Sequence, residues 1–196
     1  MTEEEYEKEV SLLDWTGILK EWRAKQTGCI NAIEWAPGKA LEYLILRAFD
    51  LERNRPSDVQ DVKYPFHKNS DGKQEQQIDG YIRTSRCCFL EECKDKKSKA
   101  KESDLSQLYI RVSNRPDTVI GLFFSMGGYT PSAIKSNESQ CHIILWDRED
   151  IEYCFDNMCF VDCLNYKLDM AEQKSIYYSS YKLYQAKEQE KLITLF

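Results

Sequence analysis

The feature that most constrains this fold is the stretch 76–94, in which two apolar runs flank a short polar segment. Both runs are rich in β-branched and aromatic residues, so the stretch predicts a β-hairpin. Because successive strand residues point to opposite faces, Glu92 and Lys94 share one face and Glu91 lies on the other. The hairpin folds the strand that carries Asp79 back beside Glu92. Two carboxylates and one ammonium are therefore expected to meet beside apolar neighbours.

Two converging carboxylates, Asp79 and Glu92, suit a hard cation such as Mg²⁺ or Mn²⁺, which binds oxygen ligands and keeps several waters. Such a cation lowers the pKa of a bound water and offsets charge on a phosphoryl oxygen. The ammonium of Lys94 can then orient the attacking water or stabilise the developing charge. The alternative is an ordinary surface hairpin with one cross-strand salt bridge, because short motifs recur by chance.

Ile78-Asp79-Gly80, followed by Glu92-Cys93-Lys94 at the end of an apolar strand, resembles the motif of the PD-(D/E)xK nuclease superfamily. Within that superfamily the chain resembles the Mrr-type restriction endonucleases and the archaeal-type Holliday-junction resolvases. The proline that precedes the aspartate in the motif is replaced here by Ile78, at a position that varies widely. The resemblance runs from about Gly38 to Asp150 and leaves both ends of the chain unexplained.

The resemblance implies that Asp79 and Glu92 hold Mg²⁺ or Mn²⁺ together with the backbone carbonyl of Cys93. Lys94 would position the attacking water, and in-line attack on the phosphodiester would leave a 5′-phosphate. The implied fold is of the restriction-endonuclease-like α/β class, in which a mixed central sheet is flanked by helices. Extra N- and C-terminal helices are expected around this core.

Two further polar residues have both a functional and an ordinary interpretation. Glu42 lies in Gly38-x-x-Leu41-Glu42, which resembles the opening helix of the Mrr-type family, whose glutamate there contributes to the site. A carboxylate in the first turn of a helix is also favoured by the helix dipole alone. Gln107 follows the Glu-x-Lys strand, as in relatives where a glutamine helps to hold the site or the backbone phosphate. Surface glutamines are common, so its ordinary interpretation stays open.

A run of five lysines in eight residues begins at Lys94. Charge runs are commonly solvated, mobile loops. Because this run leaves directly from the expected site, it can equally be a patch that binds nucleic-acid phosphates. The residues of this lysine patch are Lys96, Lys97, Lys99 and Lys101.

The composition limits the partners and the compartment. The 196 residues carry a net charge of −6, so a nucleic acid would be bound by a local patch or a bound cation rather than by the whole surface. No apolar run reaches the length of a membrane span, and no membrane partner is expected. The stretch Met1–Glu5 is acidic where a signal peptide is basic. A cytoplasmic protein with reduced cysteines is therefore expected.

Hydrophobic periodicity predicts both helices and strands along the chain. The expected helices are one broken or two short helices over 3–26, then 39–52, 104–113, one that begins at 130–131, 147–155 and 169–191. The expected strands are 59–64, the two arms of the 76–94 hairpin, 118–125 and 141–146, with a turn-rich loop at 67–73. The strand 118–125 is apolar throughout, which predicts that it is buried on both faces.

Three parts are expected along the chain: an N-terminal helical extension (1–36), a nuclease core (37–155) and a C-terminal helical extension (156–196). In the last part, an aromatic stripe is most simply core or a dimer seam, with a base-stacking platform as the alternative. Its members are Tyr177, Tyr181 and Tyr184. A zinc site could be assembled from His142, Cys154, Cys159 and Cys163. The spacings match no standard zinc module, so buried reduced thiols are expected instead.

The residues and the resemblance together predict a metal-dependent endonuclease that hydrolyses DNA, as the effector nuclease of a bacterial defence or restriction system. A partner protein or a homodimer is expected to supply specificity. One alternative is a non-catalytic scaffold or DNA-binding subunit with the same fold, although a scaffold has no physical need for two carboxylates facing one lysine. Another alternative is a ribonuclease with the same site, which these residues do not distinguish from a DNA nuclease.

Overall fold

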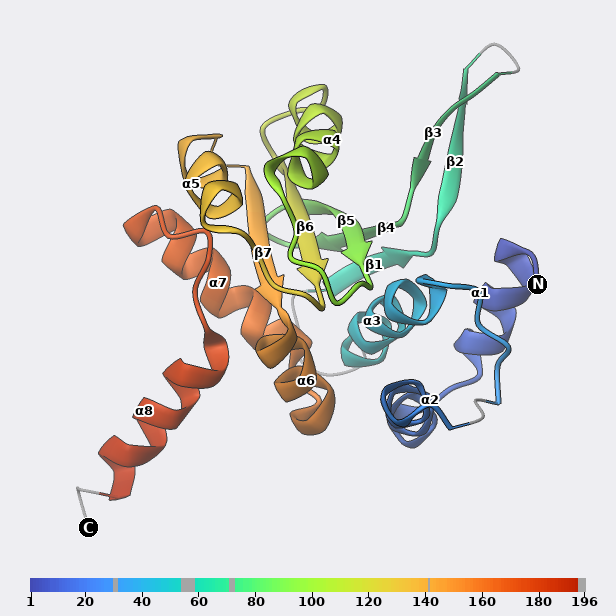
Figure 1. Cartoon of the computed structure of the whole chain (residues 1–196), viewed down its shortest axis with the longest axis horizontal. Coiled ribbons are helices and arrows are strands. Elements are labelled where there is room, and N and C mark those ends of the chain that lie inside the picture. The colour runs from blue at the N-terminus through green and yellow to red at the C-terminus, as the bar shows by residue number, and fades with distance from the viewer. Residues whose placement is uncertain (30–31, 54–58, 71–72, 141, 194–196) are drawn as a thin grey trace.

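A mixed five-stranded sheet forms the centre of the described chain (Figure 1). The computed structural model describes residues 1–29, 32–53, 59–70, 73–140 and 142–193. In order across the sheet, the strands are β1 (Val59–Lys63), β4 (Gly80–Thr84), β5 (Cys88–Lys94), β6 (Val119–Ser125) and β7 (Ile143–Asp147). The first three strands are antiparallel and the last three are parallel, with β5 common to both sets. The predicted α/β class with a mixed central sheet is confirmed.

Helices cover both faces of this sheet (Figure 1). One face carries α3 (Lys39–Glu52), α6 (Arg148–Asn157) and α7 (Phe160–Lys174), and the other carries α4 (Glu102–Ser113) and α5 (Pro131–Gln140). Along β5, Phe89 joins the core beside α3 and Leu90 joins the core beside α4, so the strand alternates as predicted. Within the described part of the chain, no helix combines the length and the apolarity needed to cross a membrane.

The N-terminal extension forms two helices, α1 (Glu3–Ser11) and α2 (Trp15–Thr27), which contribute side chains to the core around α3. The break between them lies just before Asp14, whose carboxylate accepts a hydrogen bond from the Gly17 N–H at 2.8 Å and so caps α2. Two short helices were one of the predicted possibilities. Gly17 does not interrupt a helix, because it lies in the first turn of α2.

Between β1 and β4 the chain forms a separate antiparallel ribbon of two strands, β2 (Phe66–Ser70) and β3 (Lys73–Ile78), which projects from the body (Figure 1). The prediction of a turn-rich loop over 67–73 is therefore wrong for the part that belongs to β2, and residues 71–72 lie outside the described residues. A loop was predicted because this stretch is rich in turn-forming residue types. Pairing with β3 overrides that local preference, as strand propensity depends strongly on context.

The helix α4 begins at Glu102, two residues before the predicted start at residue 104. Its N-cap is Lys101, and the Asp104 carboxylate accepts a hydrogen bond from the Lys101 N–H at 2.7 Å. This aspartate in the first turn thereby satisfies the backbone N–H of the N-cap residue. The strand β7 begins at Ile143, and residue 141 of the predicted strand lies outside the described residues.

Two predicted helix starts are confirmed by their capping hydrogen bonds. The Thr130 hydroxyl accepts from the Ala133 N–H at 3.2 Å at the start of α5. The Asp147 carboxylate accepts from the Asp150 N–H at 3.1 Å at the start of α6. Both caps follow directly after strands or their loops, so they set the direction in which each helix leaves the sheet.

The single helix predicted over 169–191 is wrong. Ser175 adopts a left-handed conformation with φ 56° and ends α7, and a second helix, α8 (Tyr181–Ile193), begins after a short link that contains Tyr177. Tyr181 and Tyr184 then pack on Tyr166 of α7, with ring centroids 5.5 and 4.5 Å apart. Two members of the predicted tyrosine stripe therefore pack within this chain.

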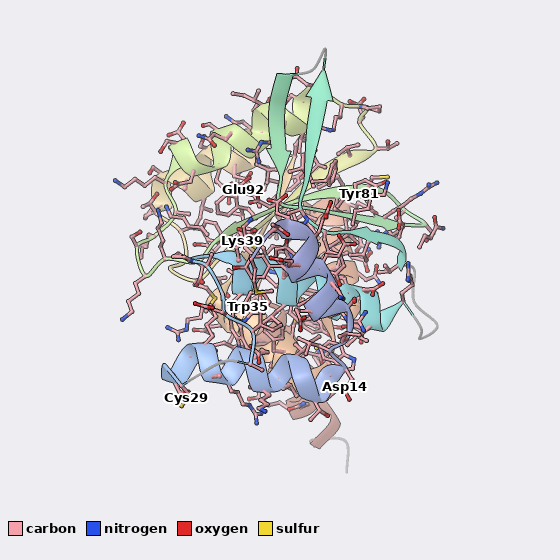
Figure 2. All side chains as sticks on the ribbon, turned by 90° about the vertical axis from the view of Figure 1, so that its right-hand side faces the viewer. Asp14, Cys29, Trp35, Lys39, Tyr81 and Glu92 are labelled. Carbon is pink, nitrogen blue, oxygen red and sulfur yellow. The ribbon has the colours of Figure 1, made fainter. Side chains whose placement is uncertain are left out.

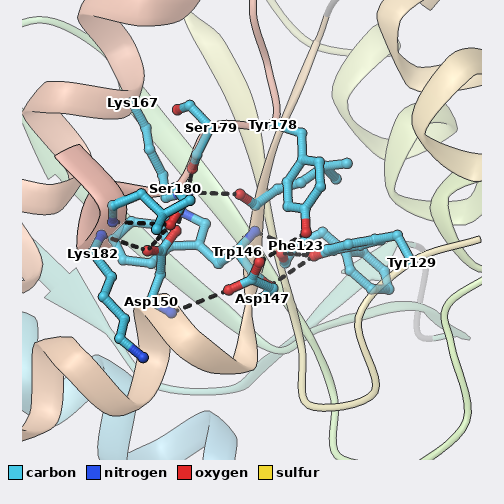
Figure 3. A network of polar contacts seen from close by, with 12 residues as sticks. Phe123, Tyr129, Trp146, Asp147, Asp150, Lys167, Tyr178, Ser179, Ser180 and Lys182 are labelled. Atoms are coloured by element: carbon cyan, nitrogen blue, oxygen red, sulfur yellow. Dashed lines mark hydrogen bonds and ion pairs between the residues drawn. The ribbon is translucent and has the colours of Figure 1, made fainter. Parts of the chain in front are cut away.

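A buried polar network anchors the link after α7 to the sheet (Figure 3). The Lys167 ammonium lies 2.7 Å from the Asp150 carboxylate, and these side chains are 1% and 0% exposed. Lys167 also donates to the Leu145 carbonyl at 3.1 Å, and Asp150 accepts from the Lys182 N–H at 3.0 Å. Each charge has both an opposite charge and backbone partners, which compensates for the loss of hydration on burial. The C-terminal helices are thereby fixed to β7 and α6.

Candidate active site

A cleft of about 470 Å³ opens at the carboxyl end of β5. Its walls come from the start of α3, the end of β5, the loop that follows and the first turns of α4. The lining includes several residues predicted for the site, namely Glu42, Glu92, Cys93, Lys94, Lys96 and Gln107. Figure 2 views this edge of the molecule, with Glu92 and Lys39 labelled at the base of the β2–β3 ribbon. Ligands of open α/β sheets bind at the carboxyl ends of the strands, where this cleft lies.

Asp79 occupies the bend that divides the first predicted arm of the hairpin into β3 and β4. Gly80 pairs with Glu91 in the antiparallel β4–β5 ladder, so the register places Asp79 opposite Glu92. The Asp79 carboxyl accepts a hydrogen bond from the Cys93 N–H, which fixes it beside the end of β5. A side chain could not replace Gly80, because a Cβ atom there would lie 2.2 Å from Glu91 Oε2.

Three carboxyl groups, Glu42, Asp79 and Glu92, are close enough to repel one another. Burial, reinforced by the charge of Asp79, raises the pKa of Glu42 to about 7 and the pKa of Glu92 to about 7. Burial also raises the pKa of Asp79 above its ordinary value. The cluster therefore carries more negative charge than its surroundings stabilise, and an added cation would favour the ionised forms.

Two cations already contact this cluster from different helices. The Lys39 ammonium of α3 lies 2.7 Å from Glu42 Oε2 and 3.9 Å from the Glu3 carboxylate. The Arg111 guanidinium of α4 forms an ion pair with Glu92. The N-terminal extension thus reaches the site through Glu3, although nothing in its sequence indicated a chemical role.

Lys94 lies in the cleft on the same side of β5 as Glu92, and its direct partner comes from α4. Its ammonium is 2.5 Å from the Asp104 carboxylate. Although partial burial opposes it, hydrogen bonds from Lys101 and Lys94 lower the pKa of Asp104, which therefore stays ionised at neutral pH. Asp104 therefore holds the Lys94 ammonium at a fixed position at the edge of the cleft.

Glu91 points to the opposite side of the sheet from Glu92, as the predicted register requires. A Cβ atom built on Gly80 would meet both its carboxyl and Leu46 of α3, so the Glu91 side chain lies against that helix. Glu91 is 1% exposed, and its Oε1 accepts a hydrogen bond from the Cys93 thiol at 3.2 Å. Burial raises the pKa of Glu91 well above its ordinary value, which favours the protonated, neutral form.

The four lysines of the patch are exposed, whereas the backbone that carries them is held in place. The Ala100 N–H donates to the Gly128 carbonyl at 2.8 Å, which links this loop to the loop after β6. The two loops also meet at Gly127, where a Cβ atom would lie 2.2 Å from the Ser98 carbonyl oxygen. A backbone fixed in this way limits how far the lysine side chains can move from the cleft.

The zinc alternative is excluded by the fold. His142 packs beside Tyr109 of α4, with ring centroids 6.1 Å apart, whereas the three cysteines belong to the core on the α3 side of the sheet. Cys154, Cys159 and Cys163 are buried there as free thiols, as expected. Within residues 1–29, 32–53, 59–70, 73–140 and 142–193, no three His, Cys, Asp or Glu side chains are arranged to hold a metal ion.

The donors at the cleft fit Mg²⁺ or Mn²⁺ better than zinc. Mg²⁺ is bound in many enzymes by one or two carboxylates, with waters and substrate phosphates completing its shell, so a third side-chain ligand is unnecessary. Asp79 and Glu92 are carboxyls that lie opposite each other and whose pKa values are raised by burial and repulsion. A divalent cation between them would remove the cause of that repulsion.

Sequence interpretation missed Lys39, Asp104 and Arg111, which hold Glu42, Lys94 and Glu92 in place. For Arg111 a weak signal exists, because it follows Gln107 by one helical turn and so shares its face. Its pairing with Glu92 depends on how α4 packs against β5, which no local pattern specifies.

A mixed sheet that presents an aspartate and a Glu-x-Lys strand at one cleft defines the class of restriction-endonuclease-like nuclease domains. Residues 37–154 match the model of the Mrr catalytic domain, a restriction endonuclease family, and the chain belongs to this family. The predicted resemblance to Mrr-type restriction endonucleases is thereby confirmed. No curated protein matches the chain.

Several solved structures are similar to this chain at low sequence identity. Protein VC1899 from Vibrio cholerae is similar with a TM-score of 0.50 and 14% identity over 64% of this chain and 34% of its own. A repair endonuclease from Pyrococcus abyssi has a TM-score of 0.38 and 18% identity, over 61% of this chain and 49% of its own. The DNA modification-dependent restriction endonuclease AspBHI has a TM-score of 0.40 and 16% identity, over 84% of this chain and 41% of its own. This chain thus spans less than half of each of these proteins.

Proposed function

We propose that this protein is a metal-dependent endonuclease that hydrolyses the phosphodiester bonds of DNA. The observation that carries the proposal is the surplus of partly buried carboxyls in a restriction-endonuclease domain: Glu42 and Glu92 line the cleft beside Lys94, and the Asp79 carboxyl interacts with both. A scaffold protein gains nothing from such a surplus, because uncompensated buried charge destabilises a fold.

Asp79, Glu92 and the backbone carbonyl of Cys93 would hold Mg²⁺ or Mn²⁺, with Glu42 as an auxiliary carboxylate. The bound cation supplies a water of lowered pKa and neutralises charge on the scissile phosphate. The donor set supports this assignment because both carboxyls are hard oxygen ligands that burial and repulsion bias toward a cation.

The residues around the cation act by position and charge. The Lys94 ammonium, fixed by Asp104 at 2.5 Å, orients the attacking water and stabilises the developing negative charge. Gln107 lines the same cleft and can donate to a phosphate oxygen. The exposed Lys96, Lys97, Lys99 and Lys101 attract the phosphates on one side of the cleft. In-line attack would leave a 5′-phosphate.

Family membership supports DNA as the substrate and a restriction or defence system as the setting. In that setting a partner protein or a second copy of the chain would supply specificity. The net charge of −6 agrees with a protein whose own affinity for nucleic acid is confined to a local patch.

Supercoiled plasmid and structured RNA, each incubated with Mg²⁺, Mn²⁺ or EDTA, test this function directly. Nicking or linearisation of DNA by the wild type with a divalent cation, and its loss in EDTA and in Glu92→Gln, is the expected result. Cleavage of RNA alone would identify a ribonuclease. Binding of DNA without cleavage in either metal would identify a DNA-binding scaffold, and cutting in excess EDTA would refute the metal mechanism.

A further inference from the structure

One face of α4 carries a countercharge for each of the two charged residues that β5 brings to the cleft. Asp104 pairs with Lys94, and Arg111 pairs with Glu92. Gln107 lies between them and lines the cleft. The opposite face of α4 is apolar and packs in the core through residues such as Leu108. The polar face of this helix therefore follows the cleft from Asp104 to Gln107, and one turn further on Arg111 reaches the cleft through its contact with Glu92.

The Arg111–Glu92 pair uses the carboxylate that a cation would need. Its side chains are 18% and 21% exposed, so solvent and ligands reach the pair. A divalent cation bound at Glu92 would compete with the guanidinium for the same oxygens. It would also repel Arg111, because both carry positive charge.

Asp79 also interacts with Arg111, but the same cation would neutralise it, so Arg111 would lose most of its countercharge. Arg115 lies one helical turn further on, contacts the backbone carbonyl of Arg111 and repels its guanidinium. With a metal on one side and Arg115 on the other, Arg111 needs an anion. The planar fork of an arginine matches the oxygens of a phosphate diester, which it can bind through two hydrogen bonds.

From this geometry we propose that Arg111 exchanges partners: it holds Glu92 while the cleft is empty and binds a backbone phosphate of the nucleic acid when a divalent cation takes Glu92. Arg111 is thus a positioning residue for Glu92 in the free protein and a substrate-binding residue in the complex. The inference rests on the proposed nuclease function. It adds a direct link between metal binding and nucleic-acid binding, because each ligand relieves the cost that the other would meet alone.

The test measures metal and DNA binding separately in Arg111→Met and Arg111→Lys. Mn²⁺ is titrated calorimetrically into each protein without DNA. Duplex DNA binding is then measured with Mg²⁺ in a Lys94→Ala background, which binds without efficient cleavage. Arg86→Met is the matched control, because Arg86 pairs with Asp169 and Glu172 on α7 and not with the site.

Opposite changes are expected for the two ligands. Arg111→Met should bind Mn²⁺ several-fold more tightly, because the competing cation is gone, and should bind DNA about tenfold more weakly, which is the loss of one charged hydrogen-bonding contact. Arg111→Lys should fall between wild type and Arg111→Met for both ligands. Arg86→Met should match the wild type in both measurements.

Weaker Mn²⁺ binding by Arg111→Met would overturn the proposal, since Arg111 would then support the metal ligands rather than compete with a cation. Tighter Mn²⁺ binding with unchanged DNA affinity would also overturn it, since Arg111 would then be a counterion only. A wild type that binds no divalent cation and cuts no DNA would refute the proposed function itself. A wild type that does both, beside an Arg111→Met variant that behaves identically, would refute the Arg111 exchange alone.

Discussion

Two charged clusters lie on this sheet, and they differ in whether their charges balance. Around Asp150 and Lys167, one buried carboxylate meets one buried ammonium at 2.7 Å, and backbone groups complete both partners. At the cleft, three carboxyls with raised pKa values lie together. The cations Lys39 and Arg111 form ion pairs with two of them, Glu42 and Glu92. A balanced cluster stabilises the fold, whereas a cluster with excess charge of one sign favours the binding of a ligand of opposite charge.

The largest expected effect is the loss of DNA cleavage when the cluster at the cleft is changed. Asp79→Asn, Glu92→Gln and Lys94→Ala should each reduce the single-turnover rate of DNA cleavage by about a hundredfold or more, as removal of a single electrostatic stabiliser does in other enzymes. Their thermal stability should be unchanged or higher for the two carboxyl variants, because the removed charge was repelled by its neighbours.

Glu91→Gln is the matched control for Glu92→Gln. The register places Glu91 on the other side of the sheet, and burial favours the protonated form of its carboxyl, which an amide resembles closely. Most of the cleavage rate should therefore remain. A Glu91→Gln variant without activity, beside an active Glu92→Gln, would show that the register of the site is wrong.

In the balanced cluster the main effect should be on stability. Lys167→Met leaves the Asp150 charge buried without its partner, which should lower the free energy of unfolding by about 3–5 kcal/mol. The double variant Asp150→Asn/Lys167→Met should recover part of that loss, because no lone charge remains. Chemical denaturation measures both values. A loss below about 1 kcal/mol in Lys167→Met would mean that the pair is not a structural anchor.

The unbalanced cluster should make stability depend on pH in a particular direction. The pKa values of Glu42 and Glu92 are about 7 in the folded protein against 4.5 in an ordinary glutamate. The folded state thus binds more protons than the unfolded state between these values, and stability should fall as the pH rises from about 4.5 to about 7. Thermal melting without metal should show this decline, and Glu42→Gln should make it shallower. Addition of Mg²⁺ should restore stability most at pH 8. A melting temperature that rises across this window equally in both proteins would contradict the expectation.

The smallest effect is expected from the lysine patch, whose charges are exposed and individually weak. Replacement of Lys96, Lys97, Lys99 and Lys101 by glutamine should reduce the salt dependence of DNA binding, with the logarithmic slope lowered by up to about 3. The control replaces four exposed lysines of the C-terminal helices, Lys174, Lys182, Lys187 and Lys191, and changes the net charge equally. Equal slopes in the two variants would show that the patch acts only through overall charge.

The sequence specified the local parts of this site well. The period-two pattern of β5 predicted that Glu92 and Lys94 share a face, and the apolar runs predicted the hairpin, whereas the mixed sheet was implied by the family resemblance. The bend at Asp79 and the β2–β3 ribbon escaped prediction because strand pairing there overrides turn-forming residue types. The break at Ser175 escaped it because a left-handed serine leaves no distinctive pattern.

The partners of the proposed catalytic groups could not be predicted for a different reason. Lys39, Asp104 and Arg111 are ordinary charged residues on helices, and their roles arise only when α3 and α4 meet at the end of β5. Lys167 gave no signal either, because a lysine in an amphipathic helix is normally exposed, and this one is buried by the link after α7. Tertiary packing therefore decides which charges balance.

Calorimetric titration of Mn²⁺ into the wild type, Glu91→Gln and Glu92→Gln at pH 8 tests most directly whether the surplus of carboxyls is a cation site. We expect saturable binding to the wild type and to Glu91→Gln. Glu92→Gln removes a metal ligand and should weaken Mn²⁺ binding at least about tenfold. Mutation of a residue that only orients a metal ligand already weakens metal affinity by that much. A folded wild type that takes up no divalent cation, or a Glu92→Gln variant that binds as tightly as the wild type, would contradict a metal site at this cleft.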